Sequence, residues 1–339
     1  MGKADDPRKD SNLRRFAGNA FWMLVAKVGV KGASLVFVII LARALGTEQY
    51  GYFNFAVSFV SMFLILGGWG LELALIREVA RDRDRLSLLF ASGLALRTVL
   101  GLVGLLISAL CIQFFVGQEG PVLALAIVGS ALFLDELTSF LGAVFKAFER
   151  SALYALVMLA NRALSTCLAA VALILGAGLT FVAVTYFLGS LGALAFAWGI
   201  LYRKFPPIQL RDVRWSVMKT LWRHGTPLGI ASFLTLVAFR IDMVMLQAIS
   251  GPVAVAMYGV SYRFLESFLF VTWSFSTAIL PRMARAQHRR ETARVYQLTV
   301  ALKFMWRTGA VRLRDLRSLD PLLPLPMKEE SDLQQSSSK

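Results

Sequence analysis

Eight apolar stretches, each long enough to cross a lipid bilayer, follow one another along the chain. They cover residues 21–45, 52–75, 86–116, 122–144, 152–175, 179–201, 228–249 and 253–280. A helix needs about 20 consecutive apolar residues to span the hydrocarbon core. The stretches are too long for barrel strands and do not alternate strictly, so they predict helices. The expected fold is an all-α, polytopic transmembrane helix bundle of about eight spans.

The Lys and Arg residues between these stretches fall on alternate connectors, with one near-exception at Arg43. The N-terminal arm and the second, fourth and sixth connectors are basic, whereas the odd-numbered connectors are nearly bare. Basic connectors of membrane proteins stay in the cytoplasm. We therefore expect a multi-pass protein of the inner, cytoplasmic membrane with a cytoplasmic N-terminus.

Composition agrees with a membrane protein. Hydrophobic residues make up 57% of the chain, which leaves too little polar surface for a water-soluble globule of 339 residues. The formal net charge of +15 sits mainly on the basic connectors, where it meets anionic lipids. Because bilayer spans separate these connectors, we do not expect nucleic acid as a partner.

An internal repeat is indicated by two Tyr-Gly pairs, at residues 50–51 and 258–259. Each follows a small-residue turn and precedes an apolar span with a basic exit, at Arg81 and Arg285. The alternative is that membrane proteins share such turns and basic exits by chance, but three matched features in the same order favour a duplicated segment. Spans seven and eight then correspond to spans one and two, so the chain holds one complete six-helix lobe and part of a second.

The chain is expected to divide into five segments. They are a cytoplasmic arm (1–18), a six-helix lobe (19–201), a cytoplasmic connector (202–226), two spans of a second lobe (227–295) and an atypical cytoplasmic tail (296–339). Within the connector, Trp215, Met218 and Trp222 fit an interfacial helix or, equally, an ordinary linker. The tail loses its apolar character after about Met305, as a shifted reading frame or an early stop would produce.

Charged residues inside the apolar stretches are the candidates for function. Each costs roughly 2.5–3.5 kcal/mol if it faces lipid at mid-depth, so we expect them to face one another or a wet cavity. We predict substrate binding by Lys27, Lys31, Arg97, Arg162, Arg240, Asp242 and Arg263. Basic groups outnumber acidic ones, which suits a substrate that bears phosphate.

Several of these residues have a structural alternative. Lys27 and Lys31 share a helix face and either line an anion path or reach back to the interface. Arg240 either faces the cavity or pairs with Asp135 or Glu136.

The other arginines also leave two interpretations open. Arg263 has Glu266 on the same helix face as a partner. Arg97 and Arg162 have no acidic neighbour at helical spacing, so cavity lining and pairing across helices are equally expected.

No catalytic pattern is found in the sequence. His224 and His288 have no acidic pair at ligand spacing, and Cys111 and Cys167 lie inside spans without a CxxC motif. Without a nucleotide-binding loop, transport would be driven by an ion gradient or by the gradient of the substrate itself. We therefore expect no enzyme, no cofactor and no metal site.

Four sequence blocks carry a family resemblance: residues 19–59, GLELALIREVAR, FRIDMVMLQAISG with MYGVSYRFLESF, and AILPRMAR. Over residues 15 to 295 the chain resembles the polysaccharide transporter family of Wzx-type oligosaccharide flippases, in the multidrug/oligosaccharidyl-lipid/polysaccharide exporter superfamily. The resemblance implies translocation of a polyprenyl-pyrophosphate-linked oligosaccharide by alternating access between two six-helix lobes, for polysaccharide biosynthesis alongside polymerase machinery. The family usually has more spans, so the resemblance also implies a C-terminal truncation.

Three other functions stay open. A multidrug or small-solute exporter of the same superfamily would be favoured by a mainly acidic lumen. A membrane-embedded glycan polymerase or ligase would be expected to carry its catalytic residues on a large outer loop, and the outer connectors are short. An inactive truncated fragment is the third.

Overall fold

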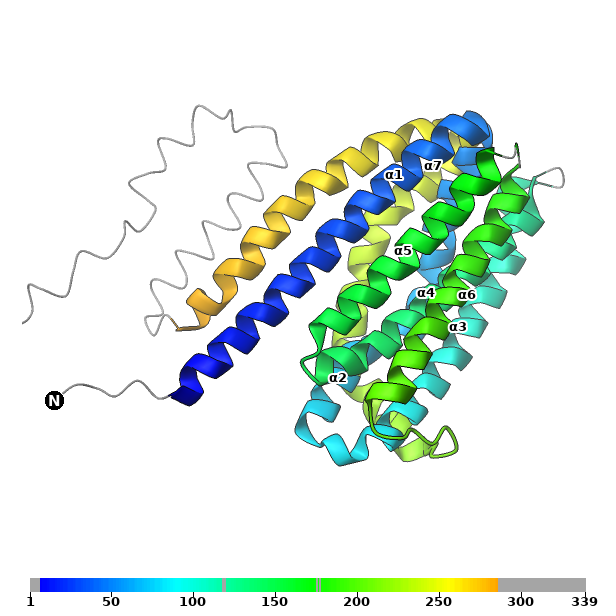
Figure 1. The fold of residues 1–339 in the computed structure, drawn as a ribbon. Coiled ribbons are helices and arrows are strands. Elements are labelled where there is room, and N and C mark those ends of the chain that lie inside the picture. The colour runs from blue at the N-terminus through cyan, green and yellow to red at the C-terminus, as the bar shows by residue number, and fades with distance from the viewer. Residues whose placement is uncertain (1–6, 118–119, 175, 177, 286–339) are drawn as a thin grey trace, which may run out of the picture. The chain divides into compact units, whose positions relative to one another are not determined.

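The computed structural model describes residues 7–117, 120–174, 176 and 178–285, and their side chains from Val28 to Arg263. The described part is helical and contains no strand, which confirms the all-α expectation (Figure 1). The elements are α1 (Pro7–Gly68), α2 (Leu71–Arg81), a 3-10 turn η1 (Arg83–Arg85), α3 (Leu86–Val116), α4 (Val122–Ala147), α5 (Ser151–Ile174), α6 (Leu179–Lys204) and α7 (Trp215–Arg285). The atypical tail expected at 296–339 lies outside the described residues.

Six helices of the described part are long and apolar enough to cross a membrane. Two of them are interrupted at a glycine with a positive φ: Gly46 in α1 (φ 76°, ψ 171°) and Gly251 in α7 (φ 76°, ψ −174°). Glycine adopts this backbone conformation without the steric cost that a Cβ adds. Divided at these two residues, α1 and α7 each cover parts of two predicted stretches, and the chain is a multi-span membrane protein.

Two helix boundaries differ from the apolar stretches. The stretch at 52–75 is not one helix, because α1 ends at Gly68 and α2 begins at Leu71 after Trp69 and Gly70, both with positive φ. Conversely, α7 begins at Trp215 and continues without a break into the seventh stretch. The Trp215, Met218 and Trp222 pattern therefore lies on the first turns of a long helix.

The chain forms two compact units, Met1–Glu266 and Ser267–Lys339, and every contact given below lies in the first. Within it, α4 packs against α5 and α6, and α1 packs against α3, α4 and α5 (Figure 1). One apolar core forms around Leu41, Tyr50 and Phe55, and a second around Phe90 and Phe140. Burying such side chains stabilises the unit mainly through dispersion contacts with close-packed neighbours.

Connectors with few charges gather at one end of this unit. Gln49, next to the kink of α1, accepts a hydrogen bond from the backbone N–H of Leu179 at 3.1 Å. Near the second kink, Pro252 packs directly against Gly51. The turns at Gly46, Gly178 and Gly251 therefore meet, as the alternation of the connectors requires.

The basic connectors gather at the opposite end. Arg150 donates a hydrogen bond to the Lys204 carbonyl at 2.9 Å, which joins the fourth connector to the sixth. His224 Nδ1 lies 3.0 Å from Glu78 Oε1, which joins α7 to α2. The charge asymmetry along the sequence is thus an asymmetry between the two ends of the unit.

Candidate substrate cavity

A cavity of about 270 Å³ lies between α1, α4, α5, α6 and α7. Its lining is polar on one part and apolar or aromatic on another. The residues are Ser34, Phe37, Val38, Phe53, Val57, Ser61, Leu64, Leu132, Asp135, Glu136, Arg162, Tyr186, Arg240 and Arg263. Polar groups at membrane depth are tolerated where they line a wet cavity of this kind.

Three of the seven predicted binding residues line this cavity: Arg162 from α5, and Arg240 and Arg263 from α7. They are far apart in the sequence, and the fold of the first unit brings them to one cavity. A guanidinium group presents a flat fork of N–H donors that matches two oxygens of a phosphate or carboxylate. The cavity therefore has the chemistry to hold an anion.

The other predicted residues lie elsewhere. Lys31 is exposed and is not among the described residues that line the cavity. It lies one helical turn before Ser34, which lines the cavity. The side chain of Lys27 lies outside the described residues. Asp242 accepts hydrogen bonds from the Tyr258 hydroxyl and from the backbone N–H of Met243.

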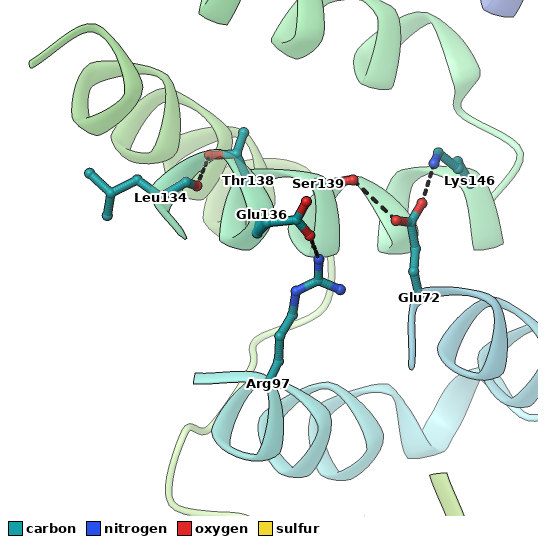
Figure 2. A network of polar contacts seen from close by, with 7 residues as sticks. All are labelled: Glu72, Arg97, Leu134, Glu136, Thr138, Ser139 and Lys146. Carbon is teal, nitrogen blue, oxygen red and sulfur yellow. Dashed lines mark hydrogen bonds and ion pairs between the residues drawn. The ribbon is translucent and has the colours of Figure 1, made fainter. Parts of the chain in front are cut away.

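Arg97 is buried and forms an ion pair with Glu136 across the α3–α4 contact (Figure 2). Its side chain is 4% exposed, whereas that of Glu136 is 47% exposed because it borders the cavity. The guanidinium carbon also lies 5.3 Å from the centre of the Phe140 ring, in cation–π range. Of the two interpretations left open by the sequence, pairing across helices holds for Arg97.

A second polar contact ties α2 to α4 (Figure 2). Glu72 accepts a hydrogen bond from the Ser139 hydroxyl at 3.1 Å and forms an ion pair with Lys146. The Lys146 ammonium also lies 3.9 Å from the centre of the Tyr154 ring. Lys146, assigned to a connector by its position, is therefore part of the helix packing at the basic end.

Asp135 joins α4 to both neighbouring helices. Its Oδ1 accepts a hydrogen bond from Asn161 of α5 at 2.9 Å, and its Oδ2 accepts one from the Tyr186 hydroxyl of α6 at 2.8 Å. Both donors are neutral. Arg162 also interacts electrostatically with Tyr186, so the acidic and basic parts of the cavity meet at this hydroxyl.

Known proteins share both sequence and fold with this chain. Residues 16–287 match the family described as "Polysaccharide biosynthesis protein". The chain belongs to this family. It is 23% identical over 286 residues to the succinoglycan biosynthesis transport protein ExoT of Rhizobium meliloti (strain 1021), a match that covers 83% of this chain. The chain spans about half the length of that relative, 56%.

Solved structures of membrane transporters share the fold of this chain. A multidrug resistance MATE family transporter of the MOP superfamily in its inward-facing conformation has a TM-score of 0.66 at 19% identity, covering 82% of this chain and 68% of that one. A MOP superfamily transporter from Pyrococcus furiosus has a TM-score of 0.57 at 17% identity, covering 80% and 72%. The match to the family confirms the resemblance seen in the sequence, and these structures show that the fold is shared.

Two residues of the cavity region, Tyr186 and Asn161, do not stand out in the sequence. The sequence marks Asp135 as a charge inside a span, but not as a binding residue. A tyrosine or asparagine at mid-span has no sequence signal that separates it from ordinary packing. A search for the neutral partners of each intramembrane charge would have pointed to them.

Proposed function

We propose that this protein translocates an oligosaccharide linked to a polyprenyl diphosphate from the cytoplasmic to the outer leaflet of the inner membrane. Membership of a polysaccharide biosynthesis family and the similarity to a succinoglycan transport protein support a role in glycan export. One observation carries the choice of a diphosphate-linked substrate: Arg162, Arg240 and Arg263 line a single cavity.

The three arginines bind the two phosphate groups in this proposal. Arginine is costly inside a membrane, and a cavity that brings three of them together is suited to an anionic substrate. Glu136 does not cancel this charge, because Arg97 already neutralises it from behind the lining. Among the described lining residues, three arginines therefore stand against Asp135 and Glu136, so basic groups outnumber acidic ones.

We extend the proposal to Lys27 and Lys31, which stand four residues apart in α1. Their spacing places both on one face of the helix, and Lys31 precedes the cavity residue Ser34 by one turn. They attract the headgroup before it reaches the arginines. Asp242 contributes indirectly, since it fixes Tyr258 on the segment of α7 that also carries Arg263.

Translocation follows by alternating access. The headgroup enters the cavity from the basic end, which faces the cytoplasm together with the N-terminus, while the polyprenyl tail stays in lipid. An ion gradient or the gradient of the substrate supplies the free energy, and polymerase machinery receives the glycan.

Binding of undecaprenyl diphosphate to the purified chain in detergent tests the role of the arginines. Arg162→Gln and Arg240→Gln should each weaken binding by about tenfold, because each removes a charge-assisted hydrogen bond. Arg203→Gln is the matched control, since Arg203 is exposed at the basic end of α6. Equal affinity of all four proteins would reject the proposed site.

A gene deletion tests the role in cells. Cells that lack the protein should accumulate lipid-linked sugar repeats on the cytoplasmic leaflet, where an impermeant glycosidase or lectin applied to inverted vesicles can reach them. Normal transfer of these repeats to the outer leaflet would contradict the proposal.

Export of a cationic small molecule is the second candidate. Asp135 and Glu136 line the cavity, and a MATE multidrug transporter has a similar fold, with a TM-score of 0.65 at 13% identity. The pairing of Glu136 with Arg97 weakens this candidate. Tight binding of the lipophilic cation tetraphenylphosphonium to the purified chain, together with no binding of undecaprenyl diphosphate, would favour it.

A further inference from the structure

We infer that the side of the cavity formed by Asp135, Tyr186, Phe37 and Phe53 is a sugar-binding subsite. It takes hydroxyl groups of the sugar that follows the diphosphate. The inference rests on the proposed function, because it assumes a glycan attached to the anion that the arginines hold.

The first observation is the hydrogen bonding of the Asp135 carboxylate. Each of its oxygens accepts one hydrogen bond, from Asn161 or from Tyr186. An ionised carboxylate accepts at about four lone-pair positions, so about two more donors can be accommodated. Asp135 is partly exposed and lines the cavity, which places this capacity where a ligand would lie.

Adjacent sugar hydroxyls are suitable donors for it. They are neutral, so they bring no charge into the membrane, and a hydrogen bond to a carboxylate is roughly twice as strong as one between neutral groups. Asn161 and Tyr186 hold the carboxylate from two different helices. The acceptor is therefore oriented before the ligand arrives.

The second observation is an aromatic cluster beside this carboxylate. Phe37 and Phe53 contact Tyr186 with ring centres 5.9 Å and 6.2 Å away, and lie 5.9 Å from each other. All three residues line the cavity. An aromatic face is negative, so it attracts the polarised C–H groups on the apolar face of a sugar ring.

The presence of an acidic residue, Asp135, in a cavity proposed to bind an anion calls for a physical explanation. Asp135 repels a diphosphate, and a charge at this depth costs roughly 2.5–3.5 kcal/mol on insertion scales. An asparagine could tie α4 to α5 and α6 without either penalty. Recognition of neutral hydroxyl groups explains why an acid stands here.

The size of the cavity limits what it can hold. Pockets that enclose a drug-sized ligand have volumes of about 300–1,000 Å³. At about 270 Å³, this cavity has room for a headgroup with one sugar and not for a whole oligosaccharide. The subsite therefore recognises the first sugar, and the remaining glycan extends beyond it.

Two probes separate the subsite from the anion site: undecaprenyl diphosphate, and the same lipid carrying one hexose. Asp135→Asn keeps the shape of the side chain and removes its charge. In the purified chain it should weaken binding of the glycosylated probe by about tenfold, the size of a lost charge-assisted hydrogen bond. Binding of the bare probe should be unchanged or slightly tighter.

A second pair of variants does not depend on Asp135. Phe53→Leu removes an aromatic ring from the wall of the cavity, whereas Phe55→Leu changes a similarly buried ring on the same helix that does not line it. Only Phe53→Leu should weaken binding of the glycosylated probe relative to the bare one. Equal effects of the two would mean that the rings only pack.

The outcomes also separate this inference from the proposed function. If Asp135→Asn and Phe53→Leu leave the preference for the glycosylated probe as in the wild type, the subsite is wrong while the diphosphate site stands. The subsite is also wrong if both probes lose affinity equally. If the wild type binds neither probe, the proposed function fails.

Discussion

At the scale of single residues, Arg97 and Arg162 show what a sequence can and cannot predict. Both are lone arginines in apolar spans with no acidic neighbour at helical spacing. In the structure, Arg97 is buried against Glu136, whereas Arg162 lines the cavity. Their difference comes from the rotation and packing of helices, which local spacing does not encode. The cost of a charge in a membrane predicted that each arginine faces another charge or a wet cavity, but not which of the two.

The ion pair of Arg97 predicts a defined loss of stability. Arg97→Met leaves Glu136 beside Asp135 without its counter-charge, and breaking a buried pair in this way costs several kcal/mol. Because Glu136 is half exposed, we expect Arg97→Met to lower the free energy of unfolding by about 2 kcal/mol. A lower midpoint of thermal unfolding in detergent would show this loss. The double variant Arg97→Met with Glu136→Leu should recover most of it, and Arg203→Met should cost nothing measurable.

An Arg97→Met protein as stable as the wild type would mean that the pair contributes no stability. Failure of the double variant to recover would mean instead that Arg97 acts through the Phe140 ring.

At the scale of helices, the start of α2 and the first turns of α7 form a glycine seam, made of Gly70, Gly225 and Gly229 around Trp69. A Cβ on Gly70 would overlap the Gly225 carbonyl oxygen, and one on Gly229 would lie 2.9 Å from the backbone of Trp69. The Trp69 ring stacks on Trp222 with centres 5.4 Å apart. The seam therefore joins the start of α2 to α7.

Apolarity predicted the helices but not this seam. The residues from Phe63 to Leu75 are apolar throughout except for Glu72, so a hydropathy pattern runs across the break between α1 and α2. The break is set by the positive φ of Trp69 and Gly70 and by the close approach of α7. Hydropathy depends neither on backbone φ nor on the approach of another helix, so it does not show this break. The Gly-Trp-Gly sequence is a turn signal that could have indicated it.

The seam predicts that alanine substitution lowers stability at one of two neighbouring glycines and not at the other. Gly70→Ala introduces a Cβ at φ 70° and against the Gly225 carbonyl, so it should cost more than about 2 kcal/mol. Gly68→Ala is the matched control, because a Cβ there meets nothing within 4 Å. Thermal unfolding of both variants in detergent measures the difference. Equal unfolding midpoints of the two variants would mean that α2 and α7 can move apart at the seam without a measurable loss of stability.

At the scale of the whole molecule, the alternation of charge along the sequence corresponds to two distinct ends of the first unit. Gln49 and Leu179 meet at the end with few charges. At the other end, Ser87 at the start of α3, next to the second connector, donates a hydrogen bond to Asp212 of the sixth connector at 3.0 Å. The sequence therefore predicted which connectors share a side. The sequence could not place the cavity, because its residues come from five helices.

The two ends make the membrane orientation testable with reporter fusions. By the positive-inside bias, the end that carries the basic connectors should face the cytoplasm. An alkaline phosphatase fused after Gly178 or Gly251 should therefore be active, since this enzyme folds outside the cytoplasm, and one fused after Arg85 or Arg211 should be inactive. A cytoplasmic reporter, such as a fluorescent protein that folds only inside, should give the opposite pattern at the same four sites. Neutralising the four arginines of residues 77–85 should weaken the bias at the second connector and make its fusion partly active. Reversed activity at two or more sites would place the basic end outside, and the substrate would then have to enter the cavity from the other side.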